Sequence, residues 1–138
     1  MAAKTKPKQK CLVLYSKARE SYYAKIYSPA IKSAKVEPVS AAKIITTAAR
    51  ISKVLKAIEE VTFVLVDVSD RDRDVLFRAG LAHGANKPVG IIAESAEDVP
   101  SDLQHVGYVV YDVRQPGWES ELKKEIVLLI RGTLKSSK

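Results

Sequence analysis

The sequence predicts an α/β fold of three layers, in which helices cover both faces of a five-stranded parallel sheet. Residues 61–68 are apolar at nearly every position, which is the pattern of a strand buried on both faces, as in a parallel sheet. Short apolar runs alternate along the chain with stretches of helical periodicity. Such alternation gives parallel strands joined by right-handed crossovers, and we expect the strand order 2-1-3-4-5.

Length and composition indicate one globular domain. The chain has 138 residues, of which 46% are hydrophobic and 28% charged. We expect a basic flexible tail at 1–10, a single α/β domain at 11–135 and a short C-terminal tail at 136–138. No apolar run approaches the roughly 18 residues that a membrane span needs. The first ten residues lack the apolar segment of a secretory signal, so we expect a cytoplasmic protein in which the single Cys11 is a buried thiol.

The first domain elements are a strand, a helix and an edge strand. Residues 11–15 form a short apolar run that ends in a polar turn at 16–20. Apolar residues then recur at helical spacing, at Tyr22, Tyr23, Ile26, Tyr27, Ala30, Ile31 and Ala34. Pro29 should kink or shorten this helix, because proline lacks an N–H donor. The run 36–39 predicts a strand, and Pro38 places it at a sheet edge.

A second helix precedes the central strand. Thr46 or Thr47 can cap it. Its expected inner face holds Ala48, Ile51, Val54, Leu55 and Ile58, and its expected outer face holds Arg50, Lys53 and Lys56.

The second half continues the alternation. A helix over about 72–85 has little polar surface, because Val75, Leu76, Ala79, Leu81 and Ala82 are apolar or small, and we expect it to be buried, with Gly80 packed closely against the sheet. Strands follow at 89–93 and 108–113, separated by an acidic loop at 94–106. The last helix presents Trp118, Leu122, Ile126, Leu129 and Ile130 on one side.

Basic charge is concentrated in the first half of the chain. Residues 1–60 carry 13 basic and 4 acidic side chains, a net charge of +9, whereas 61–114 carry 5 and 9, a net of −4. Clustered positive charge suits a nucleic-acid backbone, and Lys4, Lys6, Lys8, Lys10 and Lys25 are the candidate contacts. Tyrosines around Lys25 could stack on bases. The alternatives are a solubilising tail and tyrosines that belong to the core.

Any binding site is expected at the carboxyl ends of the strands, where open parallel sheets bind ligands. Arg71, Arg73 and Arg78 lie near the start of a helix whose free N–H groups favour anions, which predicts a phosphate site. Ser16, Lys17 and Arg19 follow the first strand and should face the same crevice. The alternative is that Asp70, Asp72 and Asp74 neutralise these arginines.

Several chemistries find no support in the sequence. His83 and His105 are isolated, and with no cluster of cysteine and histidine we expect no metal. We expect His83 to be a hydrogen-bonded packing residue. The chain has no glycine-rich phosphate loop and no serine or cysteine nucleophile with a neighbouring histidine, so we expect no cofactor.

The order of motifs over 11–113 resembles that of the nucleoside 2-deoxyribosyltransferase-like, TIR-like superfamily. The most specific part is VLFRAGLAHGANKPV together with the Asp74 that precedes it. Asp74 to Phe77, Gly80 to His83 and Lys87 to Val89 fall in step with the family pattern. Pro100 and the pair Asp102-Leu103 match a later motif of that family. The resemblance implies cleavage of N-glycosidic bonds in nucleosides or NAD, by a glutamate on the helix that begins near residue 72.

The glutamate position of that pattern is occupied by Arg78. Glycosyl transfer passes through a cationic centre that a carboxylate stabilises or attacks, and a guanidinium repels it. The chain therefore resembles a degenerate member of the superfamily. Asp74 or Asp67 could act as a displaced carboxylate, although Asp74 and Arg78, spaced i,i+4, could also pair on the helix surface.

We weigh three functional hypotheses. The first is a non-catalytic protein that recognises nucleic acid, either RNA or a ribonucleoprotein such as the ribosome. The second is an N-glycosidase, deoxyribosyltransferase or NAD-cleaving enzyme that uses a displaced carboxylate. The third is a sensor of small nucleotides. No membrane partner is expected, and the question of whether the chain forms a homo-oligomer stays open.

Overall fold

The computed structural model describes residues 9–44 and 51–136. Five parallel strands form one sheet: β1 (Lys10–Leu14), β2 (Glu37–Ser40), β3 (Phe63–Asp67), β4 (Val89–Ala93) and β5 (Val109–Val110). Their order is β2-β1-β3-β4-β5, so the predicted α/β fold and flavodoxin-like topology are confirmed. Several predictions concern positions outside the described residues, namely Lys4, Lys6, Lys8, Thr46, Thr47, Ala48, Arg50 and residues 137–138.

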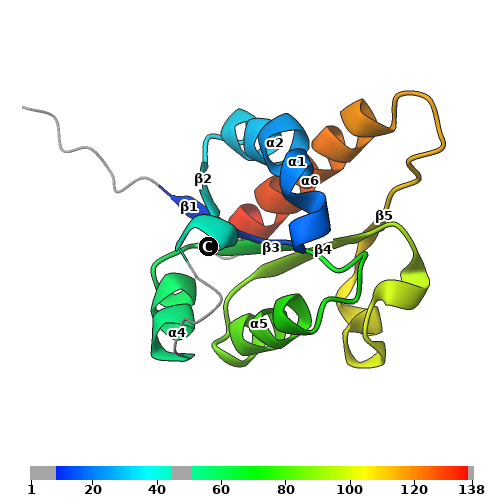
Figure 1. Ribbon diagram of the computed structural model, residues 1–138. Coiled ribbons are helices and arrows are strands. Elements are labelled where there is room, and N and C mark those ends of the chain that lie inside the picture. Colours follow the sequence, from blue (N-terminus) through cyan, green and yellow to red (C-terminus); the bar gives the residue numbers. More distant parts are fainter. Residues whose placement is uncertain (1–8, 45–50, 137–138) are drawn as a thin grey trace, which may run out of the picture.

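Helices cover both faces of the sheet (Figure 1). One face carries α1 (Glu20–Tyr22), a π-helical turn (Tyr23–Tyr27), α2 (Ser28–Ser33) and α6 (Trp118–Ser136). The other carries α4 (Ile51–Glu59) and α5 (Arg73–Gly84), and the short α3 (Ala41–Ile44) follows β2. Side chains alternate between two cores, since Val64 and Val66 face α4 and α5 while Phe63 and Leu65 face α2 and α6. This arrangement explains why the strands lack polar alternation.

Pro29 does not shorten its helix. The segment from α1 through the π-helical turn to α2 is continuous to Ser33, with Pro29 in the first turn of α2. The irregularity expected from proline takes the form of the wider π-helical turn, which ends at Tyr27, two residues before it.

The predicted inner face of α4 is wrong at two positions. Ile51 and Leu55 are 54% and 41% exposed, whereas Val54, Ala57 and Ile58 are buried. The face that packs on the sheet is formed by Val54, Ala57, Ile58 and the buried Val61. Ile51 and Leu55 therefore point outward.

Two expectations for α5 are also wrong. The helix is half-buried, since Val75, Ala79 and Ala82 pack inward while Phe77 is exposed. Gly80 is exposed, and a Cβ added there would meet no atom within 4 Å. Close packing on a glycine occurs instead at Gly90 in β4, where a Cβ would lie 2.8 Å from Cζ of Phe63.

The fifth strand is shorter than the predicted 108–113. Only Val109 and Val110 pair with β4, at the edge of the sheet. The chain between β4 and β5 contains two 3₁₀ turns, Ala96–Asp98 and Ser101–Val106. Within the described ranges, no helix combines the length and the apolar character that a membrane crossing requires.

Candidate functional site

A crevice opens at the carboxyl edge of the sheet, between the segments that follow β1 and β3. These two strands are neighbours whose connections leave on opposite faces, which makes this the topological switch point. The cavity has a volume of about 520 Å³. We call it the switch-point crevice, and it is lined by Leu14, Tyr15, Ser16, Lys17, Glu20, Ala41, Ala42, Asp72, Asp74, Val75 and Arg78.

Two cations border the switch-point crevice. Lys17 lies in a 3₁₀ turn (Lys17–Arg19) directly after β1, and Arg78 lies on the second turn of α5. Neither side chain forms an ion pair or hydrogen bond with any residue that the structure describes. The predicted Asp74–Arg78 salt bridge is therefore not formed. Both cations remain available to an anion that enters the crevice.

The amino terminus of α5 is already capped. Oδ1 of Asp72 accepts hydrogen bonds from the backbone N–H groups of Asp74 at 2.9 Å and Val75 at 3.1 Å. This is a standard N-cap, and it satisfies two of the amides that would otherwise attract an anion. A phosphate at this edge would therefore depend mainly on side chains.

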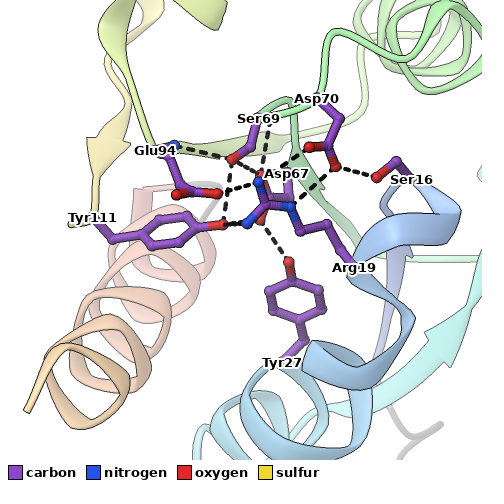
Figure 2. A network of polar contacts seen from close by, with 8 residues as sticks. All are labelled: Ser16, Arg19, Tyr27, Asp67, Ser69, Asp70, Glu94 and Tyr111. Carbon is purple, nitrogen blue, oxygen red and sulfur yellow. Dashed lines mark hydrogen bonds and ion pairs between the residues drawn. The ribbon is translucent and has the colours of Figure 1, made fainter. Parts of the chain in front are cut away.

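A buried polar network lies beside the crevice (Figure 2). Its centre is Asp67, at the end of β3, which is only 3% exposed. Oδ2 of Asp67 accepts hydrogen bonds of 2.6 Å from the hydroxyls of both Tyr27 and Tyr111, and Oδ1 accepts from the backbone N–H and the hydroxyl of Ser69. Asp67 does not line the crevice. Its oxygens are occupied by protein donors, as a buried carboxylate requires.

The two tyrosines of this network stay protonated. Burial raises the pKa of Tyr27 and of Tyr111 far above the ordinary value, and the neighbouring charge of Asp67 raises both pKa values further. Both phenols are therefore permanent donors to Asp67 at physiological pH. The arrangement fixes the ends of β3 and β5 against the helical layer that carries Tyr27.

Arg19 is held by acids rather than left free for a ligand. Its side chain is 13% exposed, donates to Asp70 from Nε at 3.0 Å and Nη2 at 3.1 Å, and pairs with Glu94. Burial lowers the pKa of Arg19, but hydrogen bonding to Asp70 and nearby Tyr111, Asp67 and Glu94 raise it above the ordinary value. Hydrogen bonds from Arg19 and Ser16 in turn lower the pKa of Asp70. The hydroxyl of Ser16 is thus also committed, although Ser16 borders the crevice.

The predicted anion-binding residues divide into two groups. Ser16, Lys17 and Arg78 line the switch-point crevice, as does the fallback carboxylate Asp74. Arg19 belongs to the buried network, Arg71 pairs with Asp98 at 2.7 Å, and the exposed Arg73 lies outside the lining. Arg19 and Arg71 are thus paired with acids that are distant in the sequence.

The described lysines proposed for nucleic acid lie apart from the crevice. Lys10 is exposed at the first residue of β1, at the opposite end of the strand, and Lys25 is exposed on the π-helical turn. The tyrosines around Lys25 have protein partners. Tyr23 stacks on Tyr15 with ring centroids 5.6 Å apart, and Tyr22 packs against Trp118 at 5.5 Å.

The sequence does not predict four residues of this network. Tyr27 fits the apolar stripe of its helix, and no motif marks Ser69, Glu94 or Tyr111. One signal was available, because a tyrosine at a core position needs a partner for its hydroxyl. The partner is Asp67, the acid at the end of the most apolar strand.

His83 is a further correction. It was expected to be hydrogen-bonded, but its buried Nε2 has no hydrogen-bond partner among the described residues. Burial lowers the pKa of His83, as does the charge of His105. Over residues 9–44 and 51–136, no group of three or more histidine, cysteine or acidic side chains could hold a metal ion.

Comparison with known protein families gives no match, and neither does comparison with curated proteins. Among solved structures, the chain is similar to the TIR domain of a Toll-related receptor from the lower metazoan Hydra magnipapillata. The two share 18% sequence identity with a TM-score of 0.60, over 84% of this chain and 96% of that chain. The similarity shows a TIR-like fold. The relation to nucleoside deoxyribosyltransferases stays a prediction from the motifs.

Proposed function

We propose that this chain is a non-catalytic binding protein whose switch-point crevice takes a small phosphorylated ligand of the nucleotide class. The observation that carries the proposal is that Lys17 and Arg78 border a cavity of about 520 Å³ without a counter-ion among the described residues. A cavity of this size lies within the range of small-molecule sites, about 300–1,000 Å³.

The two cations suit a phosphate group. A guanidinium matches two phosphate oxygens with parallel N–H donors, and an ammonium adds a mobile charge. Because Asp72 already caps α5, Arg78 supplies the directional contact that the helix terminus does not.

The acids of the crevice further restrict the class of ligand that fits. Glu20, Asp72 and Asp74 line the same cavity. Their carboxylates accept hydrogen bonds but repel anions, and one oxygen of Asp72 is occupied by the helix cap. A ligand with one anionic group and several hydroxyl or amine donors satisfies both kinds of side chain. A nucleoside monophosphate has this distribution, with its phosphate on Arg78 and its sugar hydroxyls near the carboxylates.

Two features argue against glycosidic cleavage by the usual route. Arg78 occupies the position at which the resembling enzymes hold a glutamate, and a cation there opposes an oxocarbenium-like centre. Asp67, the most buried carboxylate of this edge, is surrounded by four protein hydrogen bonds and lies outside the crevice lining.

A second candidate function rests on Asp74. This carboxylate lines the switch-point crevice and forms no ion pair with a described residue, so it could approach a ribosyl carbon. Incubation with NAD and with nucleosides, followed by chromatography, tests for cleavage. If free base forms with the wild-type chain but not with Asp74→Asn, the function is catalysis rather than binding.

A thermal-shift panel of nucleotides and their unphosphorylated nucleosides tests the main proposal. A ligand at about 100 times its dissociation constant adds about 2.7 kcal/mol to the unfolding free energy. We expect a nucleotide to raise the melting temperature of the wild-type chain and of Arg73→Ala, but not that of Arg78→Ala. Arg73→Ala is the matched control, since it removes an exposed arginine of the same helix outside the crevice.

Recognition of nucleic acid by the basic tail stays a prediction. Lys10 and Lys25 do not border the crevice, so oligonucleotide binding through them would be separable from nucleotide binding. The nucleic-acid hypothesis would be favoured over the nucleotide proposal if the chain bound RNA in a salt-dependent manner while no mononucleotide raised its melting temperature.

A further inference from the structure

A second concave surface lies between α2 and α6, on the face of the sheet opposite α4 and α5 (Figure 1). Its volume is about 410 Å³. Ala30 and Ser33 form the α2 side, and their small side chains leave the space between the two helices open. The hydroxyl of Ser33 donates to the backbone carbonyl of Pro29 at 3.0 Å, so it does not require a ligand.

The α6 side of this groove is apolar in the middle. Val127 is partly buried, and the neighbouring Leu128 is 61% exposed, the largest exposure of any large hydrophobic residue that the structure describes. An isolated exposed leucine needs no explanation, but one beside a groove can anchor a partner.

Among the residues that the structure describes, all charged side chains that line the groove are basic, namely Lys123, Lys124 and Arg131. Lys124 has one acid near it, Glu121 at 3.7 Å, but both side chains are more than 70% exposed and such a pair contributes little. We call this surface, defined by its seven lining residues, the basic groove.

We propose that the basic groove docks an acidic amphipathic helix of a partner protein. An amphipathic helix in a groove between two helices is an established mode of peptide recognition, read by apolar anchors at i, i+3, i+4 and i+7. Leucine-like anchors of the partner would enter the space above Ala30 and Ser33, beside Leu128. Acidic residues flanking those anchors would meet Lys123, Lys124 and Arg131, and this charge complementarity selects the partner.

Charge argues against a second copy of this chain as the occupant. A two-fold contact brings the same patch of two chains together. It would place Lys124 and Arg131 of one copy near the same cations of the other, with no acid of the groove to compensate. The groove is lined by residues of two helices, which suits a rod-shaped occupant lying along them.

Fluorescence anisotropy of labelled amphipathic peptides tests this inference on the full chain. The probes are a helical peptide with leucines on one face and glutamates flanking them, and its counterpart with lysines in place of the glutamates. The groove variant is Lys124→Glu/Arg131→Glu. The control is Lys53→Glu/Lys56→Glu, which reverses two exposed charges on α4, on the other face of the sheet.

We expect the acidic peptide to bind the wild-type chain and the control, and to bind the groove variant at least about tenfold more weakly, because each reversal turns an attraction into a repulsion. Leu128→Ala should also weaken binding of the acidic peptide, although this substitution changes no charge. Circular dichroism melting verifies that the variants fold.

Four results would overturn the inference. The lysine peptide could bind as well as the acidic one, or both double variants could bind the acidic peptide equally. Vesicles of anionic lipid could retain the chain through Leu128 and the cations while the acidic peptide fails to compete, which would assign the surface to a membrane. Sedimentation could instead show a dimer that Lys124→Glu/Arg131→Glu dissociates, which would assign it to self-association.

Discussion

The hydroxyl of Tyr111 donates a 2.6 Å hydrogen bond to Oδ2 of Asp67, across 44 residues of sequence. The same oxygen accepts from Tyr27, so one buried carboxylate joins β3 to the strand at the sheet edge and to the helical layer (Figure 2). The network reaches the switch-point crevice at Ser16, whose hydroxyl donates to Asp70, the partner of Arg19.

Removing either phenolic donor should destabilise the fold. A hydrogen bond to a charged group contributes about 1.5–3 kcal/mol, and its loss leaves a buried carboxylate less solvated. We expect Tyr27→Phe and Tyr111→Phe each to lower the unfolding free energy by about 2 kcal/mol in urea titrations. Tyr108→Phe is the control, since its hydroxyl donates to exposed Gln104 at 3.0 Å. Equal effects in all three variants would contradict the role assigned to Asp67.

Two glycines should respond to alanine in opposite directions. At Gly90 a Cβ would lie 2.8 Å from Cζ of buried Phe63, and relieving such a clash typically costs about 1–3 kcal/mol. At Gly80 nothing lies within 4 Å, and alanine in a helix is favoured over glycine by about 1 kcal/mol. Thermal unfolding of Gly90→Ala and Gly80→Ala should therefore show a lower and a higher melting temperature than wild type. A stabilised Gly90→Ala would be inconsistent with this packing.

Acid should weaken the fold partly through Asp70. Hydrogen bonding from Arg19, followed by that from Ser16, lowers the pKa of Asp70 in the folded state. The folded state therefore binds the proton less readily than the unfolded state. The stabilisation is complete above the unfolded pKa, near 3.9, and is lost as the pH falls through the lower folded pKa. We expect Asp70→Asn to be less stable at neutral pH and to lose less stability between about pH 5 and pH 2. If the wild type and Asp70→Asn lost equal stability as the pH falls over this range, the contribution of Asp70 would be refuted.

His83 should add a second pH dependence at milder acidity. Burial, and then the charge of His105, lowers the pKa of His83, so the unfolded state takes up the proton first. Stability from this group is complete above about pH 6.5 and falls as the pH decreases toward the folded pKa. In urea titrations at several pH values, His83→Leu should lose less stability than wild type between about pH 7 and pH 5. His105→Gln, which removes the neighbouring charge, should lie between the two. A wild-type chain whose stability is constant over this range would exclude the effect.

The sheet was predictable because its strands are buried on both faces. The largely apolar runs at 11–15, 61–68 and 89–93 are typical of buried strands, and the helical stretches between them impose parallel strands. The face of α4 was not predictable from its own residues. Ile51 and Leu55 fit an apolar stripe as well as Ala57 does, and tertiary packing alone decides between them.

The site was predictable in place but only partly in composition. The carboxyl edge follows from topology, and Lys17, Asp74 and Arg78 do meet there. Charge pairing was the difficult part, because Arg71 pairs with Asp98 and Arg19 with Glu94, acids on loops that sequence proximity does not connect. The tyrosines of the buried network look like ordinary core residues until the position of Asp67 is known.

The most direct test of the nucleotide proposal is a calorimetric cycle on Arg78. A nucleotide from the thermal-shift panel and its unphosphorylated nucleoside are each titrated into the wild-type chain and into Arg78→Ala, with Arg73→Ala as control. If Arg78 holds the phosphate, removing that phosphate should weaken binding to the wild type and to the control by about tenfold or more, but should change binding to Arg78→Ala little. An equal loss in all three proteins, or no binding of any nucleotide to the wild type, would contradict the proposal.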